Sequence, residues 1–149
     1  MKRTRIVGLD WGQARIGVAL SDESKLIATP MVTLKAEKRS KETAQKVLSA
    51  LLEHAKGGKY EVEKIVVGMP LMMSGKSGFL ADEVSHFIQE LKALTDIPVI
   101  SWDERLTTSM AERSLKESSL TRKRRAGVVD SIAAIIILQN YLDFSRLSS

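Results

Sequence analysis

The first part of the chain consists of three short hydrophobic runs separated by turn residues. The runs cover residues 5–10, 15–21 and 26–34 and are rich in Ile, Val and Leu, a composition typical of strands. Gly12 separates the first two runs, and the polar triplet 22–24 separates the second from the third. Because links this short join antiparallel neighbours, the pattern predicts a three-stranded antiparallel meander.

A change of period after residue 39 predicts a helix. Between residues 40 and 56 the apolar residues recur at intervals of three and four, as on the buried face of an amphipathic helix. The pair Gly57-Gly58 predicts its end. A β-branched run at 64–69, stopped by Pro70, then predicts a fourth strand.

The rest of the chain repeats the alternation of helix and strand. We expect a second amphipathic helix over residues 80–91 and a fifth strand over 97–102. Thr108 or Ser109 can cap a third helix. A last, broadly apolar helix is predicted to begin between residues 121 and 124 and to run to about residue 144.

This order of elements predicts an α/β fold. Strands joined through a helix are connected in a right-handed sense and lie parallel. Strands one, four and five should therefore be parallel, with strands two and three antiparallel at one side of the sheet. A chain of 149 residues is about one domain long, so we expect a single domain over residues 1–149.

The composition excludes several classes of protein. With 44% hydrophobic and 28% charged residues the chain is typical of globular proteins. The absence of cysteine excludes a disulfide scaffold, a zinc–thiolate site and a cysteine nucleophile. The basic N-terminus reaches Asp10 too soon for a signal peptide, and the apolar stretch 131–138 is far shorter than the roughly 20 residues that span a bilayer. We therefore expect a cytoplasmic protein without a membrane partner.

The positive charge of the chain is concentrated in one segment. Residues 113–125 contain six basic residues and one acid, which accounts for the whole net charge of +5. A patch of this kind attracts a polyanion such as nucleic acid. The alternative is an ordinary solvated helix start. The residues that we expect to bind nucleic acid here are Arg122, Lys123, Arg124 and Arg125.

Acidic residues follow the ends of two strands that should be parallel. Asp10 ends the first strand, and Asp103 and Glu104 end the fifth. Because parallel strands share a carboxyl edge, where sites in open α/β sheets are usually found, these acids should converge. Asp130 stands in the last helix just before its most apolar run, where an ionisable acid is costly unless something pairs with it.

A cluster of carboxylates at this edge predicts a metal site. Hard anionic oxygens suit Mg²⁺ or Mn²⁺, and two such ions roughly 4 Å apart can support phosphoryl transfer. Taken singly, each acid is better explained as a turn, loop or ion-pair residue; their joint placement favours the metal. Asp22 should lie at the opposite edge of the sheet, so we expect it to be a turn acid that does not bind metal.

Four segments together resemble one family. They are GLDWGQARIGVALSD (8–22), VVGMPLMMSGKSG (66–78), WDERLTTSMAE (102–112) and VVDSIAAIIILQNYL (128–142). They are similar to the YqgF or RuvX-type family of RNase H-like Holliday-junction resolvases, whose bacterial members are associated with processing of the 5′ end of pre-16S ribosomal RNA. The resemblance implies a five-stranded sheet in the order 3-2-1-4-5, a divalent-metal nuclease site and a structured RNA or branched DNA substrate.

Carried over to this sequence, the family's acids fall on three positions. They are Asp10, Asp130 and Glu104, with Asp103 as the alternative to Glu104 because neighbouring strand residues point to opposite faces. Arg105 could contact a phosphate or clamp an acid.

The loop Ser74-Gly75-Lys76-Ser77 lies between a strand and a helix, as a phosphate-binding loop does, but Pro70 stands where the first glycine is required. We therefore expect a loop beside the active edge in which Lys76 can touch a backbone phosphate.

The sequence thus predicts a metal-dependent nuclease, with three alternatives left open. These are a DNA junction resolvase, a non-catalytic RNA-binding module of ribosome assembly and a nucleotide-binding subunit. Two symmetric cuts need two sites, so a resolvase should dimerise, whereas a monomer suffices for trimming RNA. His54, His86, Trp11 and Trp102 are expected to be surface or packing residues.

Overall fold

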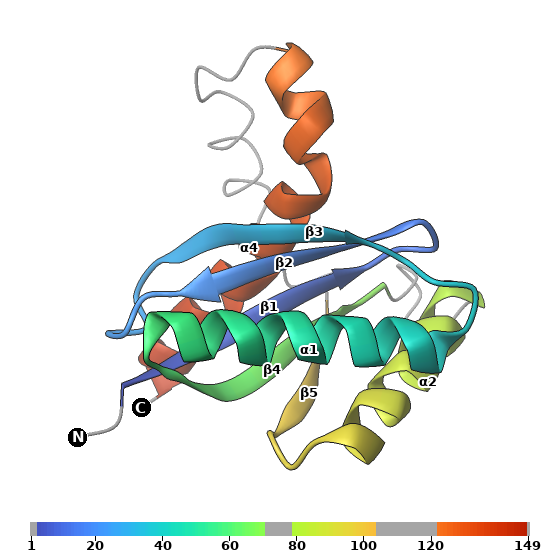
Figure 1. Cartoon of the computed structure of the whole chain (residues 1–149). Coiled ribbons are helices and arrows are strands. Elements are labelled where there is room, and N and C mark those ends of the chain that lie inside the picture. The colour runs from blue at the N-terminus through green and yellow to red at the C-terminus, as the bar shows by residue number, and fades with distance from the viewer. Residues whose placement is uncertain (1–2, 71–78, 104–121, 149) are drawn as a thin grey trace.

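A five-stranded mixed sheet forms the middle layer of the molecule (Figure 1). The computed structural model describes residues 3–70, 79–103 and 122–148, with only the backbone for 122–131 and 148. The strand order is β3-β2-β1-β4-β5, with β2 antiparallel to β1 and β3, and β4 parallel to β1 and β5. The predicted order and strand directions are confirmed. The strands are β1 (Thr4–Trp11), β2 (Arg15–Ser21), β3 (Ala28–Lys35), β4 (Glu61–Met69) and β5 (Val99–Asp103).

Helices cover both faces of this sheet (Figure 1). Helices α1 (Ser40–Gly58) and α2 (Phe79–Leu94) lie on one face, and α4 (Arg122–Ser148) lies on the other and extends beyond β3. The helix predicted to begin at Thr108 or Ser109 lies outside the described residues. Within the described part of the chain, no helix has the length and apolar character needed to cross a membrane.

Strand alternation divides the buried side chains into two cores. On β1, Val7 and Leu9 face α1 and α2, where they meet side chains such as Leu51 and Phe87. Ile6 faces α4 and belongs to a smaller core with residues of that helix. This alternation fixes the face on which each residue near the strand ends lies. The α4 residues of the smaller core are Ala134, Ile137, Leu138, Tyr141 and Leu142.

The start of β3 differs from the prediction. The apolar run begins at Leu26, but the strand begins at Ala28. The side chain of Asp22 accepts hydrogen bonds from the backbone N–H groups of Leu26 and Ile27, at 2.8 and 3.2 Å. These bonds hold both residues in the turn, where their side chains are exposed.

The end of α1 also differs from the prediction. The helix continues through Gly57 and Gly58, and Lys59 ends it in the left-handed conformation, with φ of 55°. Gly58 is favoured by packing, because a Cβ there would lie 3.0 Å from ring atoms of Tyr60, closer than an ordinary contact. The glycine therefore makes room for a buried aromatic ring.

Four other elements have shifted ends. β4 begins at Glu61, three residues earlier than predicted, because its first residues pair with the start of β1. β5 begins at Val99, directly after Pro98, which has no N–H to contribute to a strand ladder. The second and last helices are longer than predicted and end at Leu94 and Ser148.

Candidate active site

Asp10 lies near the carboxyl end of β1, on the face of the sheet that α4 covers. Two residues earlier on the same face, Gly8 touches α4, since a Cβ there would lie 2.6 Å from Leu138 Cβ and 3.2 Å from the carbonyl oxygen of Ala134. Asp10 follows in the same alternation and is partly buried. The first predicted site residue is thus at the expected edge, next to α4.

The strands on either side of Asp10 present glycines at its level. Asp10 pairs with Gly17 of β2, and the register between β1 and β4 places Gly68 at the same level on the other side. Side chains from the two neighbouring strands therefore do not crowd the carboxylate. These glycines were not predicted from the sequence as part of the site, although a glycine inside a strand is a signal of close approach.

The structure shows on which face of the sheet each side chain of β5 lies. Ile100 and Trp102 pack against the α4 core, whereas Val99 belongs to the core on the α1 and α2 side. Alternation therefore places Asp103 on the α1 and α2 side, together with its Cα partner Met69. Asp103 and the acid of β1 lie on opposite faces of the sheet.

This placement bears on the choice between Asp103 and Glu104, which the sequence left open. Asp103 is not brought together with Asp10. Glu104 lies outside the described residues, as do Arg105 and Lys76, so their roles remain predictions.

The backbone of α4 places position 130 near the edge of the sheet where β1, β4 and β5 end. Tyr141 and Leu142 line a hollow together with Ile6. Leu138 and Ala134, which come one and two turns earlier in α4, lie against Gly8. The helix thus runs against the direction of β1, and position 130 is a further turn in the direction of the strand's carboxyl end. The side chain of Asp130 is outside the described part. Arg122, Lys123, Arg124 and Arg125 begin the same helix, also as backbone only.

Comparison with known proteins decides the family. A family model described as "RuvX: Holliday junction resolvase" matches residues 4–144. The chain belongs to the RuvX family. It is 57% identical over 142 residues to a protein of Protochlamydia amoebophila, covering 95% of each chain. It is 42% identical over 140 residues to a protein of Listeria monocytogenes, covering 93% of this chain and 97% of the other. Both relatives bear the name "Putative pre-16S rRNA nuclease".

Solved structures share the fold of this RuvX chain. The structure of T. thermophilus RuvC in complex with Holliday junction substrate has a TM-score of 0.62 at 15% identity, covering 97% of this chain and 96% of that one. The fowlpox virus Holliday junction resolvase has a TM-score of 0.53 at 13% identity, covering 94% of this chain and 99% of that one. The predicted RNase H-like architecture is confirmed.

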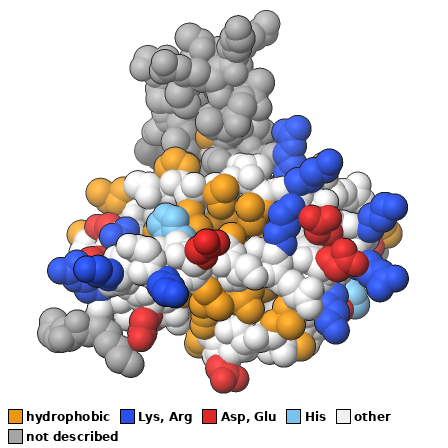
Figure 2. Space-filling view, in the orientation of Figure 1, with side chains coloured by type: hydrophobic (Ala, Val, Ile, Leu, Met, Phe, Trp, Pro, Cys, Tyr) orange, Lys and Arg blue, Asp and Glu red, His pale blue; other side chains and the backbone are white. Residues whose placement is uncertain are grey.

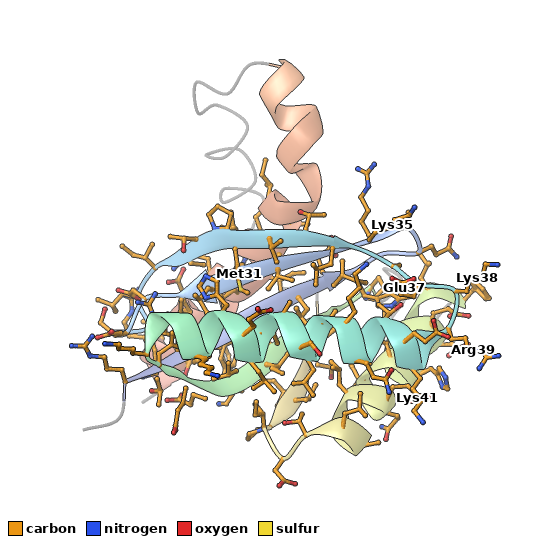
Figure 3. The ribbon with its side chains drawn as sticks, viewed as in Figure 1. Met31, Lys35, Glu37, Lys38, Arg39 and Lys41 are labelled. Atoms are coloured by element: carbon orange, nitrogen blue, oxygen red, sulfur yellow. The ribbon has the colours of Figure 1, made fainter. Side chains whose placement is uncertain are left out.

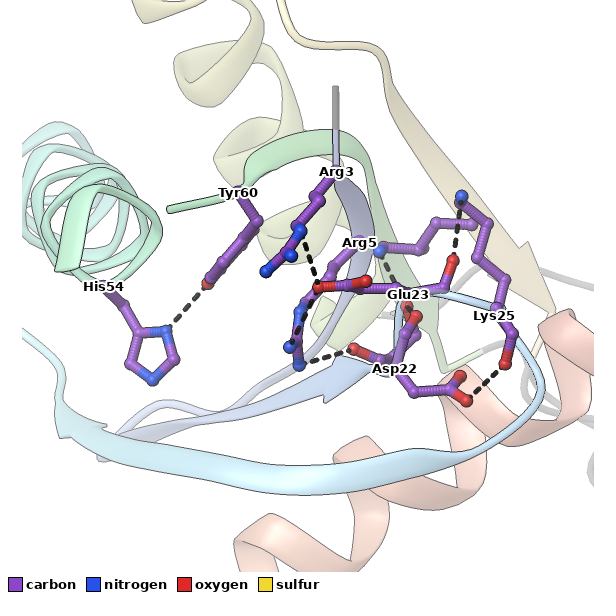
Figure 4. A network of polar contacts seen from close by, with 10 residues as sticks. Arg3, Arg5, Asp22, Glu23, Lys25, His54 and Tyr60 are labelled. Carbon is purple, nitrogen blue, oxygen red and sulfur yellow. Dashed lines mark hydrogen bonds and ion pairs between the residues drawn. The ribbon is translucent and has the colours of Figure 1, made fainter. Parts of the chain in front are cut away.

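Asp22 is a turn acid, as predicted for this RuvX chain (Figure 4). Its carboxylate accepts hydrogen bonds from Ser24 Oγ, at 2.5 Å, and from the N–H groups of Leu26 and Ile27. These bonds, with that of Ser24 the largest, lower the pKa of Asp22 from 3.8 to about 2. Its charge is thus used to hold the turn between β2 and β3, at the sheet edge away from Asp10.

The described side chains at the carboxyl edge of the sheet do not by themselves form a metal site. Within residues 3–70, 79–103 and the described side chains of α4, no three acids or histidines are close enough to hold an ion. Asp10 lies on the face that α4 covers, and its carboxylate suits a hard cation. The other two acids of the predicted set, Glu104 and Asp130, have no described side chains.

The aromatic and histidine residues have structural roles. Trp102 packs edge-to-face on Tyr141 and Phe144, with ring centroids 5.5 and 5.2 Å away. This contact confirms the expected rim packing and anchors β5 on α4. His54 and His86 are exposed on their helices, where His54 Nδ1 lies 2.8 Å from the hydroxyl of Tyr60.

Proposed function

We propose that this RuvX-family chain is a divalent-metal-dependent nuclease that processes pre-16S ribosomal RNA at its 5′ end. The catalytic acids are Asp10, Glu104 and Asp130. Arg105, Lys76 and the basic start of α4, residues 122–125, contact the nucleic acid. Support comes from the family membership and from the names of relatives that align over nearly the whole chain.

The observation that carries this proposal is the position of Asp10. Its carboxylate lies at the carboxyl edge of the parallel strands, level with Gly17 and Gly68 and on the face covered by α4. The helix backbone runs past this edge toward position 130. A phosphate group needs such an uncrowded approach to a catalytic carboxylate.

The phase of β5 favours Glu104 over Asp103. Asp103 points to the α1 and α2 side, so the next residue in a continuing strand points to the side of Asp10. Glu104 and Asp130 would then join Asp10 on one face. Asp103 would lack access to an ion held there.

Three carboxylates in one place repel one another and require a counter-charge. Asp10, Glu104 and Asp130 would hold Mg²⁺ or Mn²⁺ through their oxygens. When bound, such ions activate water and stabilise the leaving oxygen in phosphodiester hydrolysis. The carboxylates position this charge and, in the apo protein, disfavour the approach of a phosphate backbone.

The test compares wild type with Asp10→Asn on two substrates, a pre-16S RNA fragment and a four-way DNA junction. Each is incubated with Mn²⁺, with Mg²⁺ and with chelator. We expect the wild type to cleave the RNA only with metal, and Asp10→Asn to lose cleavage while it keeps its fold and its affinity for RNA. Equal activity of the two proteins, or cleavage in chelator, would contradict the proposal.

The second candidate is a DNA junction resolvase. It is favoured by the description of the family model and by the fold shared with a RuvC structure that holds a Holliday junction. Symmetric, metal-dependent cutting of the four-way junction by a dimer, with the RNA left intact, would favour it. Tight, salt-sensitive RNA binding with no cleavage of either substrate would identify a non-catalytic module. Stabilisation by ATP would identify a nucleotide-binding subunit.

A further inference from the structure

Basic side chains gather at the edge of the sheet that carries Asp10 (Figure 3). They lie where β2 begins, where β3 ends and where α1 begins. Over residues 35–46 there are five basic residues and two acids. We call five of the cations at this edge the basic band: Arg15, Lys35, Lys38, Arg39 and Lys41.

The segment that carries most of the basic band is held in place by hydrogen bonds. The N–H of Ala36 donates to the carbonyl oxygen of Ala14, at 2.9 Å, and the N–H of Glu37 donates to Thr43 Oγ1, also at 2.9 Å. Lys46 Nζ donates to the last carbonyl of β3 at 2.9 Å and to Glu37 Oε1 at 3.0 Å. Hydrogen bonds therefore tie the link between β3 and α1 to the turn between β1 and β2 and to α1 itself. The cations project from an ordered backbone.

Three cations of the basic band have no acidic partner within the described part of the chain. Lys35, Lys38 and Lys41 are exposed, and none of the ion pairs among described side chains includes them. Arg39, at the N-cap of α1, makes no side-chain cap and meets Glu42 only at 3.8 Å. The positive end of the helix dipole adds to the charge at this point.

At the opposite edge of the sheet, cations are paired with acidic side chains (Figure 4). There Arg3 and Arg5 share Glu23, at 3.8 and 3.9 Å, and Lys25 meets Glu63 at 3.3 Å. Those charges are largely balanced within the protein. The contrast indicates that Lys35, Lys38 and Lys41 of the basic band are available to an external anion. Figure 2 shows blue side chains at the end of the molecule where α1 begins.

Two surface hollows lie along the basic band. One of about 480 Å³ is lined by Arg15 and Lys35 with Thr33. Another of about 260 Å³ lies on the α1 and α2 side of the sheet, where it is lined by Trp11 and Lys38 and also by the acids Glu37 and Glu83. From strand spacing and rise, the Cα atoms of Asp10 and Lys35 are about 12 Å apart. The basic band thus begins close to the candidate catalytic acid.

We infer that the basic band binds the sugar-phosphate backbone of the substrate beside the cleaved bond. The inference rests on the proposed function and adds a second contact surface to the basic segment at residues 122–125. A cluster of carboxylates repels a polyanion, and fixed cations beside it offset that repulsion. At roughly 3.4 Å of axis per nucleotide in a strand, Lys35 lies on the order of three to four nucleotides from the cleaved bond.

The first experiment measures binding without metal. The variant Lys35→Gln/Lys38→Gln/Lys41→Gln is compared with wild type on the pre-16S fragment and the four-way junction, in chelator and over a range of salt. We expect Kd at low salt to rise at least tenfold. The slope of log affinity against log salt should become shallower by about 2 to 3, since each lost phosphate contact contributes about 0.7 to 0.9.

The matched control removes three exposed lysines from the other ends of α1 and α2. The variant Lys56→Gln/Lys59→Gln/Lys92→Gln has the same net charge as the test variant. A loss confined to the test variant, with either nucleic acid, supports the basic band and identifies which backbone it holds. Equal Kd and slope in the two variants would overturn it. Because no cleavage is needed, failure of the nuclease proposal is seen separately.

The second experiment locates the bound backbone. The chain has no cysteine, so Lys35→Cys creates a unique thiol for a photo-crosslinker. We expect crosslinks to a few nucleotides on one side of the cleaved bond, with none from a Lys56→Cys control. Crosslinks absent from Lys35→Cys, or spread evenly over the nucleic acid, would contradict the inferred position.

Discussion

Gly8 of β1 and Leu138 of α4 are in such close contact that the strand has no room for a side chain there. A Cβ on Gly8 would lie 2.6 Å from Leu138 Cβ. The contact sets the distance between the sheet and α4 two residues before Asp10. A side chain at Gly8 would therefore force β1 and α4, the helix that carries position 130, to shift relative to each other.

Gly8→Ala should therefore destabilise the protein by about 1–3 kcal/mol, the usual cost of overpacking a core. Chemical denaturation measures this change. The control is Gly57→Ala, where a Cβ meets nothing within 4 Å. Inside a helix that change should stabilise by roughly 0.5–1 kcal/mol. Equal stability of Gly8→Ala and wild type would show that α4 can retreat without cost.

Asp22→Asn should remove part of the acid sensitivity of the fold. The folded pKa of Asp22, about 2, is below its ordinary value of 3.8. The ionised carboxylate therefore stabilises the folded protein fully above pH 3.8, and this contribution is lost as the pH falls toward 2. Denaturation midpoints measured between pH 5 and pH 2 should fall less steeply in Asp22→Asn than in wild type. Glu53→Gln, which removes an exposed acid of α1, serves as the control and should leave the slope unchanged.

Mn²⁺ should raise the melting temperature of the wild type. A ligand at 100 times its Kd stabilises the folded state by about 2.7 kcal/mol, which corresponds to a shift on the order of 5 °C or more for a domain of this size. Asp10→Asn should lose the shift, because it removes one of the proposed ligands of the ion. A shift of equal size in Asp10→Asn would place the ion elsewhere.

Glu104→Gln and Asp103→Asn should differ in their effect. Glu104→Gln should reduce cleavage by at least 100-fold, since it removes a proposed metal ligand. Asp103→Asn should keep cleavage within about tenfold of wild type, because Asp103 lies on the other face of the sheet. Single-turnover rates at saturating metal measure both. The reverse ranking would show that β5 changes its phase after Trp102.

The topology was predictable because each helix between two strands fixes their relative direction. That rule alone places Asp10 and the end of β5 at one edge, as observed. The choice between Asp103 and Glu104 was not predictable, since it depends on which face Ile100 and Trp102 bury. The apolar pattern of β5 is too short to decide this.

Other features depend on contacts between distant or polar side chains. The late start of β3 follows from the bonds that Asp22 makes to Leu26 and Ile27, which no apolar pattern contains. The basic band was missed because residues outside 113–125 have no net charge when summed. Only folding separates the cations at 35–41 from the acids that balance them elsewhere.

Cations are paired with acids at one edge of the sheet, whereas lysines at the other edge are not. Unpaired positive charge is therefore distributed unevenly over the described part of the molecule. A long polyanion would turn the protein as it approaches, so that the end with Lys35 and Lys41 arrives first. Encounters would then be productive more often than random collisions allow, and added salt would slow association before it weakened the bound state. Orientation in solution, before any contact, would thus be part of how this small domain selects its substrate.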